Sequence, residues 1–228
     1  GRHEEIYKKL GAHVTKSGRT KGVAFAVWAP HARSVSVVGD FNQWKGHDHQ
    51  MQRLGNSGVW ELFIPKLTAG SLYKFEINPA NGPPLFKADP YAQHAEVPPD
   101  TSSIVYDSKY KFGDAKWIKG RIKHQYFREP LSIYEVHFGS WRRKVENDNR
   151  PFTYREMAEP LANYVTELGF THVEFLPLKE HPYGPSWGYQ VTYYYAPSAR
   201  YGEPDDLRYL IDYLHQRGIG VIMDWVPA

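Results

Sequence analysis

The hydrophobic pattern changes its period once along this 228-residue chain. In residues 23–107, apolar and polar side chains alternate in short runs that Gly, Pro and Asn interrupt, a pattern typical of antiparallel strands. In residues 131–228, the pattern becomes strand, helix, strand, helix, strand. A two-residue period suits a sheet with one wet face, whereas strands separated by helices build a parallel sheet. The chain is therefore predicted to fold as two domains of different class.

Residues 1–110 are predicted to form an antiparallel β-sandwich, and residues 111–130 a linker. In the run LYKFEIN, Tyr73 and Phe75 fall on one face, as a sandwich strand with one buried side requires. The core of this domain is expected to include Phe25, Val37, Phe63 and Phe75.

Residues 131–228 are predicted to form three parallel strands joined by two helices. Thr153 and Glu156 are spaced as a capping box at the start of the first helix, and Gly169 ends it. Pro160 is expected to kink this helix or to delay its start, because its ring clashes with the carbonyl four residues back. One face of this helix is predicted to carry the apolar residues Met157, Leu161, Tyr164, Val165 and Leu168.

Three parallel strands joined by helices begin either a doubly wound sheet or an eight-stranded barrel. The sequence has no Gly-x-Gly-x-x-Gly after a strand and no phosphate-binding loop, which argues against a nucleotide site. In a barrel, functional residues lie on the loops that follow the strands. Such a loop, EHPYGPSWGYQVTYYYAPSARYGEPDD, spans residues 180–206 and is rich in aromatic rings.

Aromatic rings in a long loop favour a carbohydrate site. A flat Tyr or Trp ring covers the C–H face of a pyranose while its polar tip hydrogen-bonds a hydroxyl. The alternative is that the rings pack the loop onto the rim of the barrel. Packing is the role expected for Tyr193, Tyr194, Tyr195 and Tyr201. Glu180 and His181 could reach a substrate, but they are expected to orient the loop by hydrogen bonds.

Composition argues against several partners. The chain has 28 Lys and Arg against 25 Asp and Glu, and its net charge of +3 is spread out, so nucleic acid is not expected. No segment approaches the ~18 apolar residues of a membrane span, so no membrane partner is expected. The absence of cysteine excludes thiolate zinc sites and fits a cytoplasmic location. His47, Asp48 and His49 have no third ligand in view, so we expect a solvated loop and no metal.

Three segments of the second half resemble a known family. PLSIYEVHFGSW, EHPYGPSWGYQVTYYYAP and VIMDWVPA follow WAPHARSVSVVGDFNQW in this order and at this spacing. Together they resemble the glycogen branching enzymes of the alpha-amylase superfamily (glycoside hydrolase family 13), over essentially all 228 residues. The resemblance implies an N-terminal immunoglobulin-like β-sandwich, similar to the CBM48 glycogen- and starch-binding modules. It also implies that the first three strands of a (β/α)8 TIM barrel follow, with the barrel incomplete in this chain.

The resemblance also implies a reaction. These enzymes cut an α-1,4 glucan and transfer the chain to a 6-hydroxyl as an α-1,6 branch, by a retaining mechanism that uses two carboxylates and no cofactor. Their nucleophilic Asp and acid/base Glu follow later barrel strands, so both are expected beyond Ala228. We therefore assign no catalytic carboxylate in this chain and expect it to be inactive alone. The partners implied are glycogen, amylose and malto-oligosaccharides.

Two residues match substrate-site positions of the family. Tyr189, in WGYQ, matches the Tyr that stacks on the sugar just before the scissile bond, and Trp187 is expected to support it. Asp224, in DWVP, matches an Asp that holds the site geometry at the end of the third strand. A carboxylate that ends an apolar strand is also costly without partners. The alternatives are a ring that packs on the rim and an ion-paired structural Asp.

Trp44 and Lys74 are candidates for a glucan site in the sandwich, because they match glucan-binding positions in the related module of AMP-activated kinase. Where that module has a second Trp, this chain offers Leu85 and Phe86. Packing between the domains is therefore the alternative role for this face.

Three functions stay open on the sequence alone. They are a branching enzyme, a related hydrolase such as isoamylase or malto-oligosyltrehalose trehalohydrolase, and a non-catalytic glucan-binding protein. The runs EVHFGSWRR and GPSWGYQ favour branching. Donor chain length, branch spacing and oligomeric state stay open.

Overall fold

The computed structural model describes residues 3–121, 123 and 128–227. The chain divides into two compact units, one formed by Gly1–Asp107 with Tyr193–Ala196 and the other by Ser108–Thr192 with Pro197–Ala228. The predicted linker, 111–130, contains the helix α1 (Ala115–Arg121), while its residues 122 and 124–127 lie outside the described part of the chain. The domain limits drawn from the sequence stay a prediction.

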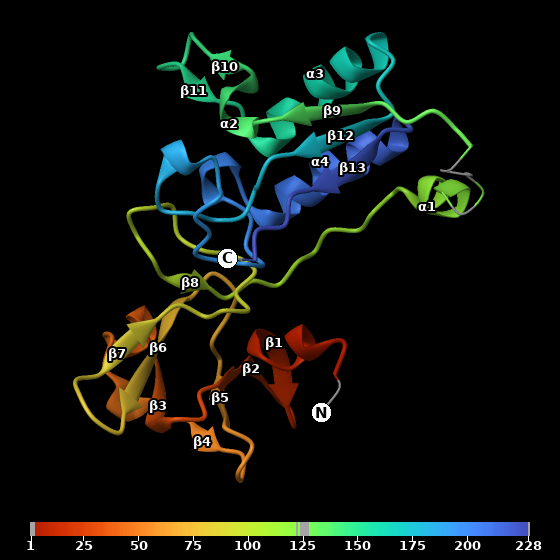
Figure 1. Ribbon diagram of the computed structural model, residues 1–228. Coiled ribbons are helices and arrows are strands. Elements are labelled where there is room, and N and C mark those ends of the chain that lie inside the picture. The colour runs from red at the N-terminus through yellow and green to blue at the C-terminus, as the bar shows by residue number, and fades with distance from the viewer. Residues whose placement is uncertain (1–2, 122, 124–127, 228) are drawn as a thin grey trace. The chain divides into compact units, whose positions relative to one another are not determined.

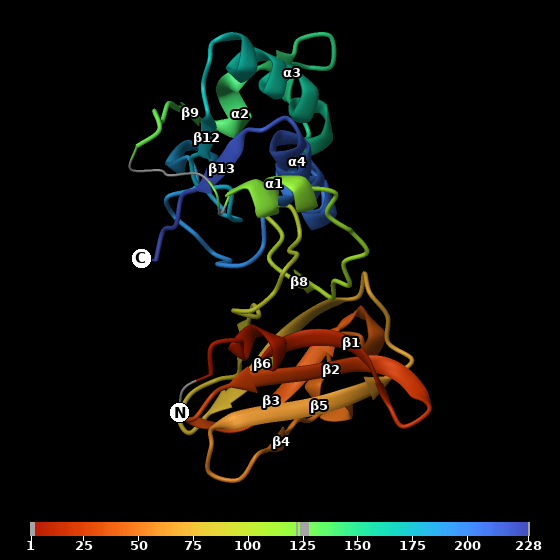
Figure 2. The ribbon, with the colours of Figure 1, turned by 90° about the vertical axis from the view of Figure 1, so that its right-hand side faces the viewer.

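The first unit is a β-sandwich in which all strand pairings are antiparallel (Figure 2). One sheet has the order β1-β2-β5-β4, formed by Gly11–Ser17, Thr20–Trp28, Val59–Pro65 and Gln52–Arg53. The other has the order β3-β6-β7, formed by Ala32–Gly39, Leu72–Pro79 and Leu85–Lys87, with β8 (Ser103–Ile104) paired to β6. Short 3-10 helices lie at Ile6–Lys8, Asp40–Asn42 and Gly46–Asp48.

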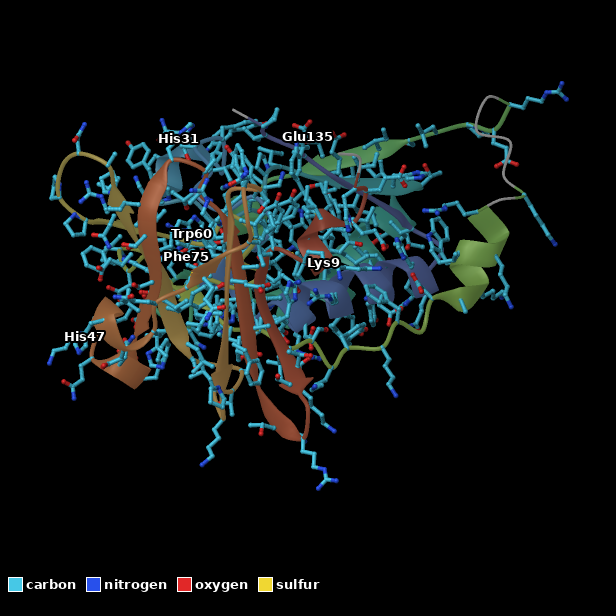
Figure 3. The ribbon with its side chains drawn as sticks, turned by 90° about the horizontal axis from the view of Figure 1, so that it is seen from below. Lys9, His31, His47, Trp60, Phe75 and Glu135 are labelled. Carbon is cyan, nitrogen blue, oxygen red and sulfur yellow. The ribbon has the colours of Figure 1, made fainter. Side chains whose placement is uncertain are left out.

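The core of the sandwich lies between the two sheets. Trp60 of β5 and Phe75 of β6 are labelled in Figure 3, and both are buried. Phe25 and Val37 are buried as predicted, and the ring of Phe25 meets that of Tyr73 edge-on, with 5.1 Å between centroids. Apolar burial of this kind is the main favourable contribution to folding. The alternating pattern therefore predicted most of this core.

Phe63 corrects one sequence prediction, because it does not lie in the core between the sheets. Along β5, Trp60, Leu62 and Ile64 contact the core, so the intervening Glu61 and Phe63 point to the opposite face. There Phe63 pairs in register with Ala24 and lines a hollow of about 460 Å³. Counting the alternation from Glu61 would have placed Phe63 outside.

The second unit contains a parallel sheet with the order β13-β12-β9, whose strands run side by side in Figure 1. The strands are Gly220–Met223, His172–Phe175 and Ile133–Val136, and the two main helices are α3 (Tyr154–Glu167) and α4 (Pro204–Gln216). Both helices bury their apolar stripes against one face of the sheet, which supplies Val136, Val173 and Phe175. The smaller elements are α2 (Phe138–Trp141), β10 (Arg143–Lys144), β11 (Arg150–Pro151) and the 3-10 helices Gly184–Ser186 and Ala199–Tyr201. The predicted fold class is confirmed.

Helix α3 starts with the predicted capping box. The Glu156 N–H donates to the Thr153 hydroxyl (3.3 Å), and the Thr153 N–H donates to the Glu156 carboxylate (2.9 Å). The helix therefore begins at Tyr154, and Pro160 does not delay its start. Of the residues placed on one face, Met157, Leu161 and Val165 are buried, Tyr164 is half-buried and Leu168 is 56% exposed. Leu168 caps the helix just before Gly169 turns the chain at φ +77°, so it lies past the buried stripe.

Candidate functional site

The ends of β12 and β13 bring Tyr189 and Asp224 together. The main-chain N–H of Asp224 donates to the carbonyl of Phe175 (3.1 Å), which extends the parallel pairing by one bond. The Tyr189 hydroxyl donates to Oδ2 of Asp224 (3.2 Å), and the Lys179 ammonium donates to the Asp224 carbonyl (3.1 Å). Lys179 Nζ also lies 3.9 Å from the ring centroid of Trp225. Two candidates that lie 35 positions apart thus share a hydrogen bond at the C-terminal ends of parallel strands.

Negative charge gathers on the sheet face beside this pair. Glu135 of β9 and Glu174 of β12 are in register, on the face opposite the helices (Figure 3 labels Glu135). Desolvation raises the pKa of Glu174, and the carboxylates of Asp224 and Glu135 raise it further. Desolvation and Asp224 likewise raise the pKa of Tyr189, so its phenol stays protonated and remains a hydrogen-bond donor.

Glu180 orients the loop that carries Tyr189. It is 1% exposed, and its carboxylate accepts hydrogen bonds from Nη1 of Arg200 (2.6 Å) and the N–H of Ala199 (2.6 Å). Its carbonyl accepts from both the N–H (2.9 Å) and the hydroxyl (3.1 Å) of Thr192. His181 uses Nδ1 toward the Lys179 carbonyl (2.9 Å). The hydrogen bonds of Glu180 connect it to residues 12 to 20 positions along the loop, as the interpretation that it orients the loop requires, whereas the bond of His181 is local.

Trp187 lies against His137, at the end of β9, with 5.4 Å between the ring centroids. It is 56% exposed, and the next residue, Gly188, has φ +86°. A Cβ at Gly188 would lie 2.2 Å from the carbonyl oxygen of Pro177, so only glycine fits between Trp187 and Tyr189. The structure therefore places Trp187 beside His137, and its support of Tyr189 stays a prediction.

The other rings of the loop mainly pack. Tyr201 is 8% exposed and lies 4.6 Å from Phe138, centroid to centroid, as the packing interpretation predicts. Tyr193 is 3% exposed and Tyr195 stacks on Tyr91 at 5.5 Å, but both belong to the sandwich unit rather than to the rim of the barrel.

The candidate residues of the sandwich already have partners. The Trp44 indole N–H donates to Oδ1 of Asp40 (2.8 Å), and the Lys74 ammonium donates to the Thr101 hydroxyl (2.7 Å). Lys74 lies on the outer face of the β3-β6-β7 sheet, because its neighbours Tyr73 and Phe75 point into the core. Phe86 is on the same outer face, opposite Glu76, and is 54% exposed.

The histidines near residue 48 have local contacts. His47, at the periphery of the sandwich in Figure 3, lies 3.1 Å from the Asp48 carboxylate, and both are exposed. His49 Nδ1 lies 3.0 Å from the Asn42 amide nitrogen. Among residues 3–121, 123 and 128–227, no three His, Cys, Asp or Glu side chains are grouped so that they could hold a metal ion. In the same part of the chain, no helix is both long enough and apolar enough to span a bilayer.

Lys179, Glu135 and Glu174 were not predicted from the sequence as residues of this site. The available signal was the strand alternation in IYEV and HVEF, which puts both glutamates on the face away from the apolar residues. Lys179 lies in the loop that follows β12, the position where barrel enzymes carry functional residues.

Two regions of the chain match known families. Residues 9–92 match Carbohydrate-binding module 48 (Isoamylase N-terminal domain), and residues 158–228 match Alpha amylase, catalytic domain. The first region coincides with most of the sandwich, and the second contains most of α3 together with β12, α4 and β13.

Curated relatives extend the similarity to the whole chain. The 1,4-alpha-glucan branching enzymes GlgB of Myxococcus xanthus (strain DK1622) and Corynebacterium jeikeium (strain K411) are 56% and 57% identical over 100% of this chain. The chain spans 32% and 30% of their respective lengths. A solved pullulanase from Bacillus acidopullulyticus is similar in fold, with a TM-score of 0.70 at 23% identity over 95% of this chain and 29% of its own. The resemblance to branching enzymes of the alpha-amylase superfamily is confirmed.

Proposed function

We propose, for a chain that joins a carbohydrate-binding module 48 to the first part of an alpha-amylase catalytic domain, that the whole protein is a 1,4-alpha-glucan branching enzyme. It cuts an α-1,4 glucan and passes the chain to a 6-hydroxyl, and the partners are glycogen, amylose and malto-oligosaccharides. The observation that carries the proposal is the Tyr189–Asp224 hydrogen bond at the strand ends, in a chain with these relatives. The chain has no cysteine, which fits the cytoplasm as the location we propose.

Tyr189 is the proposed stacking platform. Tyr189 is 48% exposed and its hydroxyl is held by Asp224, an arrangement that can offer a fixed aromatic face to a pyranose. Asp224 is held in turn through its main chain by Lys179 and Phe175. Asp224 therefore holds the ring and is not assigned as the nucleophile. We place the nucleophile and the acid/base on strands that follow β13, separated by roughly 5 Å as retention requires.

Branching, hydrolysis and simple binding give different products from amylose. A branching enzyme lowers the iodine colour of amylose without releasing reducing ends, and debranching of its product yields new short chains. The assay uses the full-length protein, and Tyr189→Ala serves as the matched variant. A rise in reducing ends equal to the bonds cut would indicate a hydrolase of the isoamylase or trehalohydrolase type. Unchanged amylose would indicate a glucan-binding protein.

We further propose that Trp44 and Lys74 bind glucan on the outer face of the sandwich. Trp44→Ala is expected to reduce retention on immobilised glycogen while the melting temperature changes little, because Trp44 makes its polar contact with the local Asp40. Trp28→Ala is the matched control, since Trp28 is 62% exposed on β2 of the other sheet. Full retention with a lowered melting temperature would instead make Trp44 a packing residue.

A further inference from the structure

Four residues of the 180–206 loop belong to the sandwich unit. The chain leaves the second unit after Thr192, and Tyr193–Ala196 pack in the first unit before the chain returns at Pro197. Tyr193 and Ala196 are 3% and 1% exposed and share a cluster with Ala92 and Ala95. Tyr193 and Ala196 therefore belong to a small buried cluster of the first unit, separate from the core between the two sheets.

The Tyr193 hydroxyl lies in a polar pocket. It donates to the main-chain carbonyl of Thr101 (2.9 Å) and lies 3.3 Å from the Ser103 hydroxyl. The Ser103 hydroxyl accepts the N–H of Asp89 (2.9 Å), and Ser103 and Asp89 are both 0% exposed. The Tyr193 hydroxyl thus has two partners, of which Ser103 is fully buried, and moving the hydroxyl would leave the Ser103 hydroxyl short of a hydrogen bond.

Thr101 has a second connection, to Lys74. The Lys74 ammonium donates to the Thr101 side-chain hydroxyl (2.7 Å), while the carbonyl of the same residue accepts from Tyr193. One residue therefore contacts both the outer face of the sandwich, through its side chain, and the loop segment, through its main chain. The two contacts use different atoms of Thr101, so each can be removed separately.

We propose that Tyr193 is a positioning residue for the loop that carries Tyr189, and that Thr101 extends this hold to Lys74. Tyr193 follows Tyr189 by four residues, so a fixed Tyr193 keeps Tyr189 within about 14 Å even in an extended chain. Thr192, one residue earlier, is held by the Glu180 carbonyl. Resting on the proposed function, this implies that loss of the Tyr193 hydroxyl lowers the branching rate, because a sugar on Tyr189 is then less well oriented for the reaction.

The test removes single atoms and reads out the loop in the full-length protein. Tyr193→Phe deletes the hydroxyl and keeps the ring, and Thr101→Val deletes the contact to Lys74 while keeping the carbonyl. Amide hydrogen exchange of residues 185–192 is expected to accelerate about five-fold in Tyr193→Phe, the effect of one lost hydrogen bond, and two- to five-fold in Thr101→Val. Thr101→Ser restores the wild-type rate because it keeps the hydroxyl. Tyr183→Phe, at a 57% exposed residue of the same loop, is the matched control, and its exchange rate is expected to stay within about two-fold of the wild-type rate.

Activity supplies a second readout. If the protein branches amylose, kcat/KM falls in Tyr193→Phe, and adding Lys74→Met costs less in that background than in the wild type, because both act through Thr101. An unchanged amide exchange rate of residues 185–192 in a folded Tyr193→Phe variant would overturn the inference. So would a double variant whose loss in kcat/KM equals the product of the losses in the Lys74 and Tyr193 single variants. A protein that does not branch amylose would sink the proposed function, while the exchange comparison still decides the role of Tyr193.

Discussion

Two hydroxyls four residues apart in one loop have opposite surroundings. The Tyr189 hydroxyl donates to Asp224, and Tyr189 is 48% exposed. The Tyr193 hydroxyl donates to Thr101, and Tyr193 is almost completely buried. An exposed ring with a fixed tip can bind a ligand face, and a buried ring with a fixed tip anchors the chain. The two tyrosines look alike in the sequence, and their different burial assigns them different roles.

Replacing Tyr189 with Ala in the full-length protein is expected to lower turnover on amylose by about one to two orders of magnitude, because a misplaced sugar loses the orientation that the reaction needs. Tyr189→Phe keeps the ring and loses only the hydrogen bond to Asp224, so a loss of about five-fold is expected. Initial rates by iodine staining check both. Tyr183→Ala, at a 57% exposed ring of the same loop, is the matched control, and an equal loss there would remove Tyr189 from the site.

A second residue-scale prediction concerns the buried carboxyl of Asp89. Burial raises its pKa from 3.8 to about 6, although the Tyr73 hydroxyl donates to Oδ2 at 2.5 Å. Between about pH 4 and pH 6 the folded state holds a proton that the unfolded chain has released. The protonated Asp89 therefore contributes about 3 kcal/mol to the unfolding free energy below about pH 4, and this contribution is lost as pH rises through 6.

Asp89→Asn removes this titration. As pH rises from about 4 to about 7, the unfolding free energy of the wild type is expected to fall relative to that of Asp89→Asn. Urea unfolding at several pH values measures it, with Asp48→Asn, an exposed carboxyl of the same unit, as the control. A difference that does not depend on pH would show that Asp89 does not titrate in this range.

At the scale of elements, the two main helices, α3 and α4, were predictable, whereas α1, α2 and the connections were not. The Thr153–Glu156 cap and the Gly169 stop act over one turn, so the sequence alone located α3 to within a residue or two. Phe63 was predicted to be in the core because it is a large apolar residue. The alternation along β5, counted from the exposed Glu61, puts it on the opposite face. Tyr193 was expected to pack on the rim of the barrel, but it packs in the first unit, and its partner Thr101 is 92 positions away, a distance at which local pattern carries no information.

The base of the loop depends on one ion pair. The Glu180 and Arg200 side chains are 2% and 23% exposed, so Glu180→Gln leaves a largely buried guanidinium without its carboxylate. A loss of about 2 to 3 kcal/mol in unfolding free energy is expected. The matched change, Glu156→Gln in the more exposed pair with Arg150, is expected to cost about 1 kcal/mol. Urea unfolding of both variants checks the ranking, and equal losses would mean that burial of the Glu180 pair adds nothing.

For the whole molecule, the decisive feature is the sheet of three strands. A barrel places its reacting groups on loops from several strands, and retention needs two carboxylates about 5 Å apart. In this chain Ile133, Met223 and Trp225 remain 39%, 39% and 57% exposed around the sheet. Exposed apolar surfaces of this kind mark interaction surfaces or aggregation-prone sites.

The polypeptide of residues 1–228 is therefore expected to show neither branching nor hydrolysis. The measurement is iodine staining of amylose together with a reducing-end assay on the mass-verified polypeptide, and the full-length protein is the positive control. Any α-1,6 branch formed, or any reducing sugar above the buffer control, would place a working carboxylate pair within these residues.

The sandwich is discontinuous in sequence, since Tyr193–Ala196 belong to it. A gene fusion that replaces residues 1–107 at a single junction would join the sandwich of one relative to the catalytic part of another. The residues equivalent to Tyr193–Ala196 would then come from the second relative and would not match the new sandwich. Ala92 and Ala95 would then meet foreign side chains, and the Thr101 carbonyl would depend on the recipient for its donor. The module and these four residues are thus expected to be inherited together, as one recombination unit interrupted by the barrel.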